Sequence, residues 1–216
     1  MVCRIPEVRA LYRGVRRPTV MKLVVGIALL VPAVGTGLVG QRDAEESVPA
    51  PRVAAAKAGD GAIARVWRER AELRARAAEA AELAREFGVS PDLAADIHAA
   101  AVEAGIDPRV AFGLVRTESS FRRTAVSHAG AVGYTQLLPS TARWLVPGTS
   151  RSELFDRETN LRIGFRYLRY LLDRYDENLH LALTAYNRGP GTVDRLVKRG
   201  RNPDNGYARK VLAQRI

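Results

Sequence analysis

The segment NLRIGFRYLRYLLDRY, residues 160–175, decides the fold class of this 216-residue chain. Its large apolar residues recur at alternating gaps of four and three positions, at Leu161, Phe165, Leu168, Leu172 and Tyr175. This spacing places them on one face of an α-helix and predicts a helix that packs against a core. No part of the chain alternates apolar and polar residues as a half-buried strand would. The pattern therefore favours an all-α protein.

Helix-start signals lie upstream of this segment. Ser90-Pro91 and Asp107-Pro108 each offer a capping side chain followed by a first-turn proline, and a glycine that can end the preceding helix stands before each pair. Residues 207–216 can form a last helix. Residues 88–216 are therefore predicted to form one helical domain, which is long enough to bury its own core.

The N-terminal part of the chain has a different composition. Residues 1–22 form a basic tail, and residues 23–40 contain no charged residue and are mostly apolar. A basic tail before an apolar stretch is typical of a cleaved export signal or a retained membrane anchor, and both readings stay open, as do Met1 and Met21 as the start. Either way we expect export to the cell envelope, in the periplasm or on the outer face of the cytoplasmic membrane.

Two segments connect this region to the helical domain. Residues 41–61 are rich in Ala, Pro, Gly and charge, which predicts a linker. Residues 62–87 are rich in Ala, Arg and Glu and predict a solvated spacer helix with only a thin apolar stripe. A coiled coil or a partner-binding helix is the alternative.

Charge and cysteine content narrow the possible partners. The net charge is +11, of which six basic groups and one acid in residues 1–22 contribute +5, while residues 88–216 contribute +6. Such a domain suits nucleic acid, anionic lipid or an anionic wall polymer. Export and the absence of a recognition motif argue against nucleic acid. The single Cys3 excludes an internal disulfide framework and a cysteine-based zinc site, and no His-Glu-x-x-His spacing or phosphate loop is present.

Four short blocks carry the most specific signal. They are GLVRTESSF at 113–121, GAVGYTQLLP at 130–139, NLRIG at 160–164 and AYNRGPG at 185–191. In this order they resemble the catalytic domain of the soluble-type lytic transglycosylases, murein-cleaving relatives of goose-type lysozyme. The resemblance covers about residues 92–213. It departs from the family pattern at Arg122-Arg123, at Tyr134-Thr135 and at Arg188.

The resemblance implies a lysozyme-like helical fold, peptidoglycan glycan strands as the substrate, and no cofactor or metal. It places the catalytic acid at Glu118, and it implies a substrate-binding set of Ser127, Gly133, Tyr134, Gln136, Tyr186 and Asn187. Structural roles stay open for four of them: Ser127 can cap a turn, Gly133 can serve a tight backbone passage or a plain turn, Tyr186 can pack in the core, and Asn187 can hold the turn at 189–191.

The implied reaction uses one carboxyl group twice. Glu118 would protonate the bond between N-acetylmuramic acid and N-acetylglucosamine and then accept the proton of the C6 hydroxyl that closes a 1,6-anhydro ring. Most glycosidases pair two carboxylates, yet no Asp or Glu occurs between Glu118 and Glu153. Asp156, Glu158 and Asp194 could still fold nearby. Two alternatives remain: a muramidase that hydrolyses the same bond, and a wall-binding scaffold without turnover.

Overall fold

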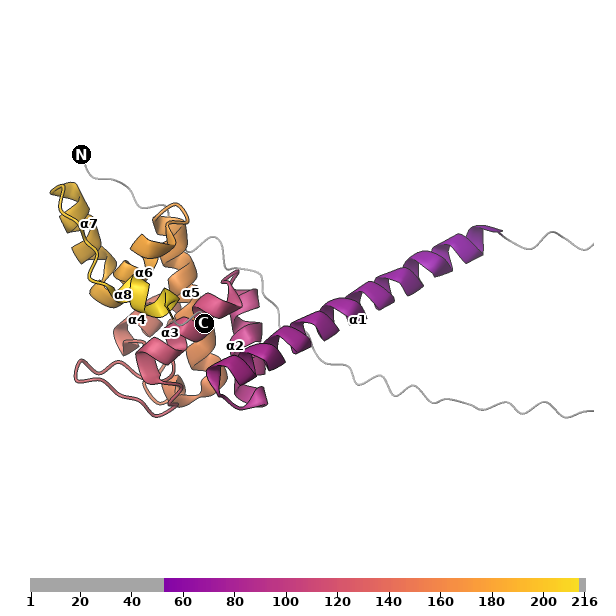
Figure 1. Ribbon diagram of the computed structural model, residues 1–216, viewed down its shortest axis with the longest axis horizontal. Helices are drawn as coiled ribbons and strands as arrows, with labels where there is room; N and C mark the ends of the chain where they lie inside the picture. Colours follow the sequence, from indigo (N-terminus) through magenta and orange to yellow (C-terminus); the bar gives the residue numbers. More distant parts are fainter. Residues whose placement is uncertain (1–52, 214–216) are drawn as a thin grey trace, which may run out of the picture. The chain divides into compact units, whose positions relative to one another are not determined.

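The computed structural model describes residues 53–213, and side chains from residue 61 onward (Figure 1). The predicted segments 1–22 and 23–40, and the first part of the linker, lie outside the described residues. None of the helices among residues 53–213 combines the length and the apolar composition of a membrane-spanning segment. The elements are α1 (Val53–Phe87), α2 (Pro91–Glu103), α3 (Pro108–Ser119), α4 (Pro139–Leu145), the 3-10 turn η2 (Glu153–Phe155), α5 (Arg157–Arg174), α6 (Leu179–Arg188), α7 (Pro190–Lys198) and α8 (Tyr207–Leu212).

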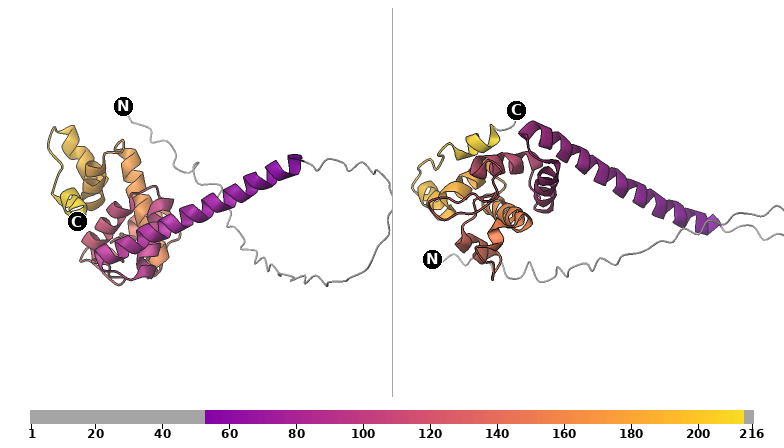
Figure 2. Two further views of the ribbon diagram at one scale, coloured as in Figure 1. Left: turned by 45° about the vertical axis from the view of Figure 1, so that its right-hand side comes forward. Right: turned by 90° about the horizontal axis from the view of Figure 1, so that it is seen from below.

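The predicted helix with the apolar stripe is α5, and it lies at the centre of the domain (Figures 1 and 2). It contacts α2 and α6, and α4 and η2 also pack against it. Four stripe residues are buried in the main core, namely Leu161, Phe165, Leu168 and Leu172. The expectation of an all-α domain is therefore confirmed: the described residues form helices, and β-pairing there is confined to isolated bridges between Val132 and residues 126 and 137.

The predicted helix caps are confirmed as well. The Ser90 hydroxyl accepts a hydrogen bond from the backbone N–H of Leu93 at 3.3 Å, and the Asp107 carboxylate accepts one from Arg109 at 2.7 Å. Asp156 does the same for α5. Each cap satisfies an N–H group that the first turn of a helix leaves without a partner.

The long helix α1 ends at Phe87, the predicted last residue of the spacer helix, but it differs from the prediction in its start and in the packing of its last turns. It begins at Val53, inside the predicted linker 41–61, because the alanines of this stretch favour helix strongly enough to outweigh Gly59 and Gly61. Its last two turns also belong to the core of the domain predicted to begin at residue 88. Side chains 61–79 are exposed, whereas Ala80, Leu83, Ala84 and Phe87 are buried, and α1 contacts α2 and α3.

A buried asparagine connects the second and third sequence blocks. Asn160, at the start of α5, accepts hydrogen bonds from the backbone N–H and the hydroxyl of Thr135, at 2.9 and 2.8 Å. Its side-chain amide donates to the backbone carbonyls of Val132 and Leu154, both at 2.9 Å. Buried polar groups need such partners, so this network fixes the path of residues 132–135 against the helix.

Two glycines allow this close approach. A Cβ atom on Gly133 would lie 2.3 Å from the side-chain amide nitrogen of Asn160, and Gly133 also has a positive φ of 79°. A Cβ atom on Gly164 would lie 2.3 Å from the hydroxyl oxygen of Thr135. Any larger residue would force the two segments apart. The loop that follows α3 is therefore held firmly on α5.

Candidate active site

Glu118 lies in the last turn of α3, where the chain leaves the helix through left-handed backbone at Ser120 and Phe121. Its Oε1 atom accepts a hydrogen bond from the Tyr207 hydroxyl of α8. Burial raises the pKa of Glu118, whereas the Tyr207 hydrogen bond and the positive charge of Lys210 act in the opposite direction. The net effect is a raised pKa, which favours the protonated acid.

Two tyrosines, Tyr186 and Tyr207, lie close to this carboxyl group. The Tyr186 hydroxyl donates to the backbone carbonyl of Thr135 at 3.0 Å. Burial and the negative charge of Glu118 raise the pKa values of Tyr186 and Tyr207 well above the ordinary value. Both phenols are therefore neutral hydrogen-bond donors over the whole physiological pH range.

Glu118 opens into a cleft of about 460 Å³, which we call the Glu118 cleft. Its lining includes Glu118, Ser127, Gln136, Tyr186 and Asn187 among the residues predicted from sequence. The fold thus brings together positions that lie up to 69 residues apart. Glu118 is the only carboxylate among the described residues that line this cleft.

Gly133 and Tyr134, also predicted to bind substrate, do not line the Glu118 cleft. Gly133 packs against Asn160, as described above, and Tyr134 is buried and lines a different hollow. In this structure both act in packing, and substrate contact by either residue stays a prediction.

Several cleft residues also hold the loop that carries them. The Ser127 hydroxyl accepts from the backbone N–H of Ala131 at 3.1 Å, which is the turn-capping role left open above. The Gln136 amide donates to the carbonyls of Ala125 and Gly133, at 3.1 and 3.0 Å. Such bonds fix side-chain orientation before any ligand arrives, which lowers the entropy cost of binding.

Asn187 is held by a partner outside the turn at 189–191. Its Oδ1 atom accepts from the side-chain amide of Asn205 at 2.9 Å, across to the segment before α8. Arg188 also lines the cleft and donates to the backbone carbonyl of Pro203 at 2.9 Å. Residues 187–188 therefore connect the floor of the cleft to the C-terminal segment.

Sequence reasoning missed Tyr207 as a site residue. It lies 89 positions after Glu118, and its segment was predicted only as a terminal helix. Nothing in the local pattern distinguishes a tyrosine that packs in a core from one whose hydroxyl reaches a distant carboxylate. Only the contact of α8 with α3 and α6 reveals the pair.

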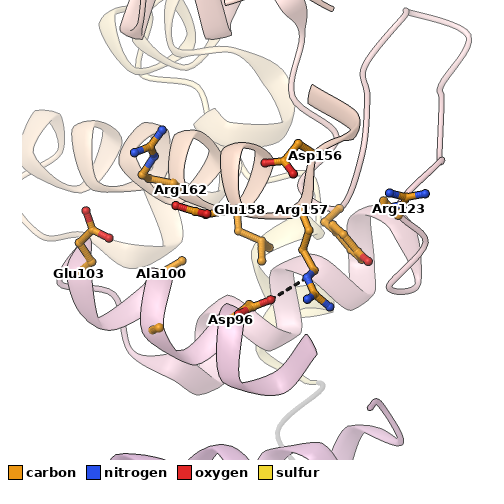
Figure 3. A pocket seen from close by; sticks show the side chains of 11 residues that line it. Asp96, Ala100, Glu103, Arg123, Asp156, Arg157, Glu158 and Arg162 are labelled. Carbon is orange, nitrogen blue, oxygen red and sulfur yellow. Dashed lines mark ion pairs between the residues drawn. The ribbon is translucent and has the colours of Figure 1, made fainter. Parts of the chain in front are cut away.

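A second hollow, of about 730 Å³, lies between α2 and the start of α5 (Figure 3). We call it the charged hollow. Its carboxylates are Asp96, Glu103, Asp156 and Glu158, and Asp96 forms an ion pair with Arg157 at 2.6 Å. Hydrogen bonds from the first turn of α5 lower the pKa of Asp156. An acid with a lowered pKa is a poor proton donor near neutral pH, so Asp156 is not the sheltered acid that glycosidic cleavage needs.

Asp194, the last of the three acids that could fold near Glu118, has other partners. Asp194 pairs with Arg174 at 2.5 Å and accepts from the Tyr175 hydroxyl at 2.9 Å, and it does not line the Glu118 cleft. Among the described residues no cluster of His, Cys, Asp and Glu has the arrangement of a metal site. The chemistry available in the cleft is thus that of one sheltered carboxyl group flanked by neutral hydroxyls.

A helical domain with one sheltered carboxyl in an open cleft is the arrangement that general acid catalysis on a polymer requires. The family model described as "Transglycosylase SLT domain" matches residues 96–207, more than half of the chain. The chain belongs to this family.

Named relatives agree with this assignment. The membrane-bound lytic murein transglycosylase C of Sodalis glossinidius (strain morsitans) is 34% identical over 122 residues, which cover 49% of this chain and 34% of the relative. The soluble lytic murein transglycosylase of Escherichia coli (strain K12) is 37% identical over 89 residues, covering 38% and 14%. This chain therefore spans about a third or less of the length of these relatives.

A solved structure supports the fold. The 70 kDa soluble lytic transglycosylase from Escherichia coli superimposes with a TM-score of 0.51 at 28% identity, over 58% of this chain and 23% of the other. The shared part is helical, as the apolar spacing of α5 predicted.

Proposed function

We propose that this chain is a peptidoglycan lytic transglycosylase, an enzyme that cleaves the β-1,4 bond between N-acetylmuramic acid and N-acetylglucosamine and leaves 1,6-anhydro ends. The observation that carries the proposal is the lone, sheltered Glu118 in the cleft of a chain of this family. The relatives named above are lytic murein transglycosylases, which supports murein as the substrate.

In the first step, the neutral Glu118 donates its proton to the glycosidic oxygen as the bond to C1 of the muramyl residue breaks. Its raised pKa, caused by burial, keeps this proton available. Among the residues that the structure describes, the cleft lining holds no second carboxylate to stabilise the positive charge that develops at C1. We infer that the N-acetyl group of the substrate itself takes this role.

In the second step, the carboxylate of Glu118 accepts the proton of the muramyl C6 hydroxyl while O6 bonds to C1. No water is consumed, and Glu118 returns to its starting protonation state. Between the two steps Glu118 is negatively charged, and the Tyr207 hydrogen bond and the nearby charge of Lys210 stabilise that form. One group can serve as acid and then base because opposing effects keep either state accessible.

The remaining cleft residues are proposed to bind the glycan. Ser127, Gln136 and Asn187 line the cleft with polar atoms, and Tyr186 lies beside Glu118. We propose that Gly133 and Tyr134, which are not among the lining residues of this cleft, position the loop, and their contact with substrate stays a prediction. Export to the envelope, through the segment 23–40 as a signal or an anchor, fits a murein substrate and relatives that are named as membrane-bound or soluble enzymes.

The test is digestion of purified sacculi, followed by mass spectrometry of the products. The unmodified chain is expected to release 1,6-anhydromuropeptides. Glu118→Gln keeps the shape of the side chain but removes the proton, and general acid catalysis alone contributes about 10²–10⁴ in rate, so turnover should fall to the assay floor. Glu158→Gln, in the charged hollow, is the matched control and should retain full activity.

Three outcomes would contradict the proposal. Products with only reducing ends would make the chain a muramidase. Binding to sacculi without any product from the unmodified chain would favour the wall-binding scaffold. More than a few per cent of turnover in a folded Glu118→Gln variant would assign the acid role to another residue.

A further inference from the structure

An exposed tryptophan lies beside the Glu118 cleft without contributing to the core. Trp144, in the last turn of α4, has 53% of its surface exposed. Its ring meets that of Tyr170 at a centroid distance of 4.8 Å and an angle of 72°. Ligand sites are concave and lined mostly by apolar and aromatic side chains with a few polar groups, so the surroundings of these two rings decide whether they can bind a ligand.

The two rings continue a row of aromatic side chains that starts at the proposed acid. Tyr186, beside Glu118, lies 5.2 Å from Tyr167, whose ring is 6.3 Å from Tyr170 and nearly parallel to it. Tyr170 in turn meets Trp144. The row therefore leads from the interior of the Glu118 cleft to the surface of α4 and α5.

A hollow of about 310 Å³ occupies the outer end of this row, and we call it the aromatic corner. It is lined by Ser140, Thr141, Trp144, Tyr167, Tyr170 and Pro190. Thr141 and Tyr167 also line the Glu118 cleft, so the two spaces share a wall. None of the six lining residues carries a charge.

We propose that the aromatic corner is a saccharide subsite that holds a further sugar ring of the same glycan strand whose bond is cleaved at Glu118. A pyranose presents apolar C–H groups on its face and hydroxyls around its edge. Two rings at 72° offer an apolar face and an apolar side wall, and the hydroxyls of Ser140 and Thr141 can bond to the sugar edge. This inference rests on the proposed function.

The lining of the aromatic corner carries no charge and therefore suits a sugar ring better than the stem peptide of murein. Peptide stems carry carboxylates, which would need a positively charged or strongly hydrogen-bonding partner in the hollow. The charged hollow and Arg188 offer such partners elsewhere, whereas the aromatic corner does not. A binding role also gives a reason for the exposed half of the Trp144 side chain, which its contact with Tyr170 leaves uncovered.

The first test compares substrates of different length. The full chain and Trp144→Ala would be assayed on a ladder of peptide-free glycan oligomers. The unmodified chain should gain in kcat/KM once oligomers are long enough to reach the aromatic corner, and Trp144→Ala should lose about tenfold on those oligomers while the shortest cleavable ones are unaffected. A purely structural role would lower activity at every length, and that outcome would overturn the proposal.

The chain contains a matched control for this substitution. Trp67, on α1, is 60% exposed and does not line the Glu118 cleft or the aromatic corner. Trp67→Ala should therefore behave as the unmodified chain at every substrate length. An equal loss in both tryptophan variants would contradict the assignment.

A second test does not depend on turnover. In a Trp67→Phe, Glu118→Gln double variant, Trp144 is the only tryptophan of the chain. Titration with peptide-free glycan strands should change its fluorescence in a saturable way, whereas isolated stem peptides should not. A fluorescence change with stem peptides alone, or no change when glycan binds, would contradict the proposed subsite. The proposed acid role fails separately, if Glu118→Gln still cleaves.

Discussion

At the scale of single residues, the cleft combines two opposing effects on Glu118. Burial raises its pKa, and the Tyr207 hydroxyl and Lys210 work against that rise. A group that must first donate a proton and then accept one is served by such a balance, since neither state is strongly disfavoured. The residue that completes the balance, Tyr207, is the one that sequence reasoning did not find.

Tyr207→Phe tests this balance. The substitution removes a hydrogen bond that stabilises the carboxylate, while the burial that raises the pKa of Glu118 persists, so that pKa should rise further. Activity that requires the protonated acid falls as pH increases through the pKa, and the basic limb of the kcat/KM profile should therefore move to higher pH. The measurement is the pH dependence of kcat/KM for soluble glycan.

The control is another tyrosine with a carboxylate partner. The Tyr175 hydroxyl donates to Asp194 at 2.9 Å, outside the Glu118 cleft, so Tyr175→Phe should leave the profile in place. A basic limb that stays fixed or moves to lower pH in Tyr207→Phe would mean that the hydroxyl does not stabilise the Glu118 carboxylate.

At the scale of helices, the sequence predicted most where short-range rules apply. The caps at Ser90 and Asp107 and the apolar face of α5 depend on neighbours within one or two turns, and these are confirmed. The burial of the last turns of α1 was not predicted, because its alanines are equally compatible with a solvated spacer and with a packed helix. Which turns of α1 are buried depends on where α2 and α3 lie, and no local pattern records that.

Two leucines of α1 test the boundary between its exposed part and its buried last turns. Leu83 is 1% exposed and Leu73 is 58% exposed on the same helix. Leu83→Ala should reduce the free energy of unfolding by about 2–5 kcal/mol through lost burial and the cavity left behind. Leu73→Ala should change it by less than about 0.5 kcal/mol. Urea unfolding followed by circular dichroism measures both, and equal effects would contradict the boundary near residue 80.

At the scale of the whole molecule, the four sequence blocks located the region of the Glu118 cleft, but they did not show which of their residues line it. Each block contributes to the Glu118 cleft or to its support: Glu118 from the first, Gln136 from the second, Tyr186 from the fourth, and Asn160 as the anchor beneath them. The block pattern could not separate residues that line the Glu118 cleft from those that do not, such as Gly133 and Tyr134. That distinction depends on the backbone path between blocks.

The sheltered acid should also affect the stability of the whole domain. Because burial raises the pKa of Glu118 in the folded state above its ordinary value of 4.5, ionisation costs folding free energy. Glu118→Gln should therefore match the unmodified chain below about pH 4.5, where both side chains are neutral. At higher pH the variant should have the larger free energy of unfolding. The difference between the two chains should grow as pH rises through the folded-state pKa of Glu118 and should then level off.

Thermal unfolding at a series of pH values measures this advantage. Glu103→Gln, in the charged hollow, serves as the control and should follow the unmodified chain. A Glu118→Gln variant that is less stable than the unmodified chain at pH 8 would show that the carboxylate is not strained in the folded protein.

The contact between the loop and α5 has a consequence for how such domains can diverge. Thr135 occupies the space beside Gly164 and bonds to Asn160, so three positions from two separate blocks constrain one another. A single replacement there meets a clash or leaves a buried group unpaired, and accepted changes should arrive as compensating pairs. Recombination between distant homologues would yield folded offspring when its crossovers fall outside residues 133–164, so that this stretch is inherited whole.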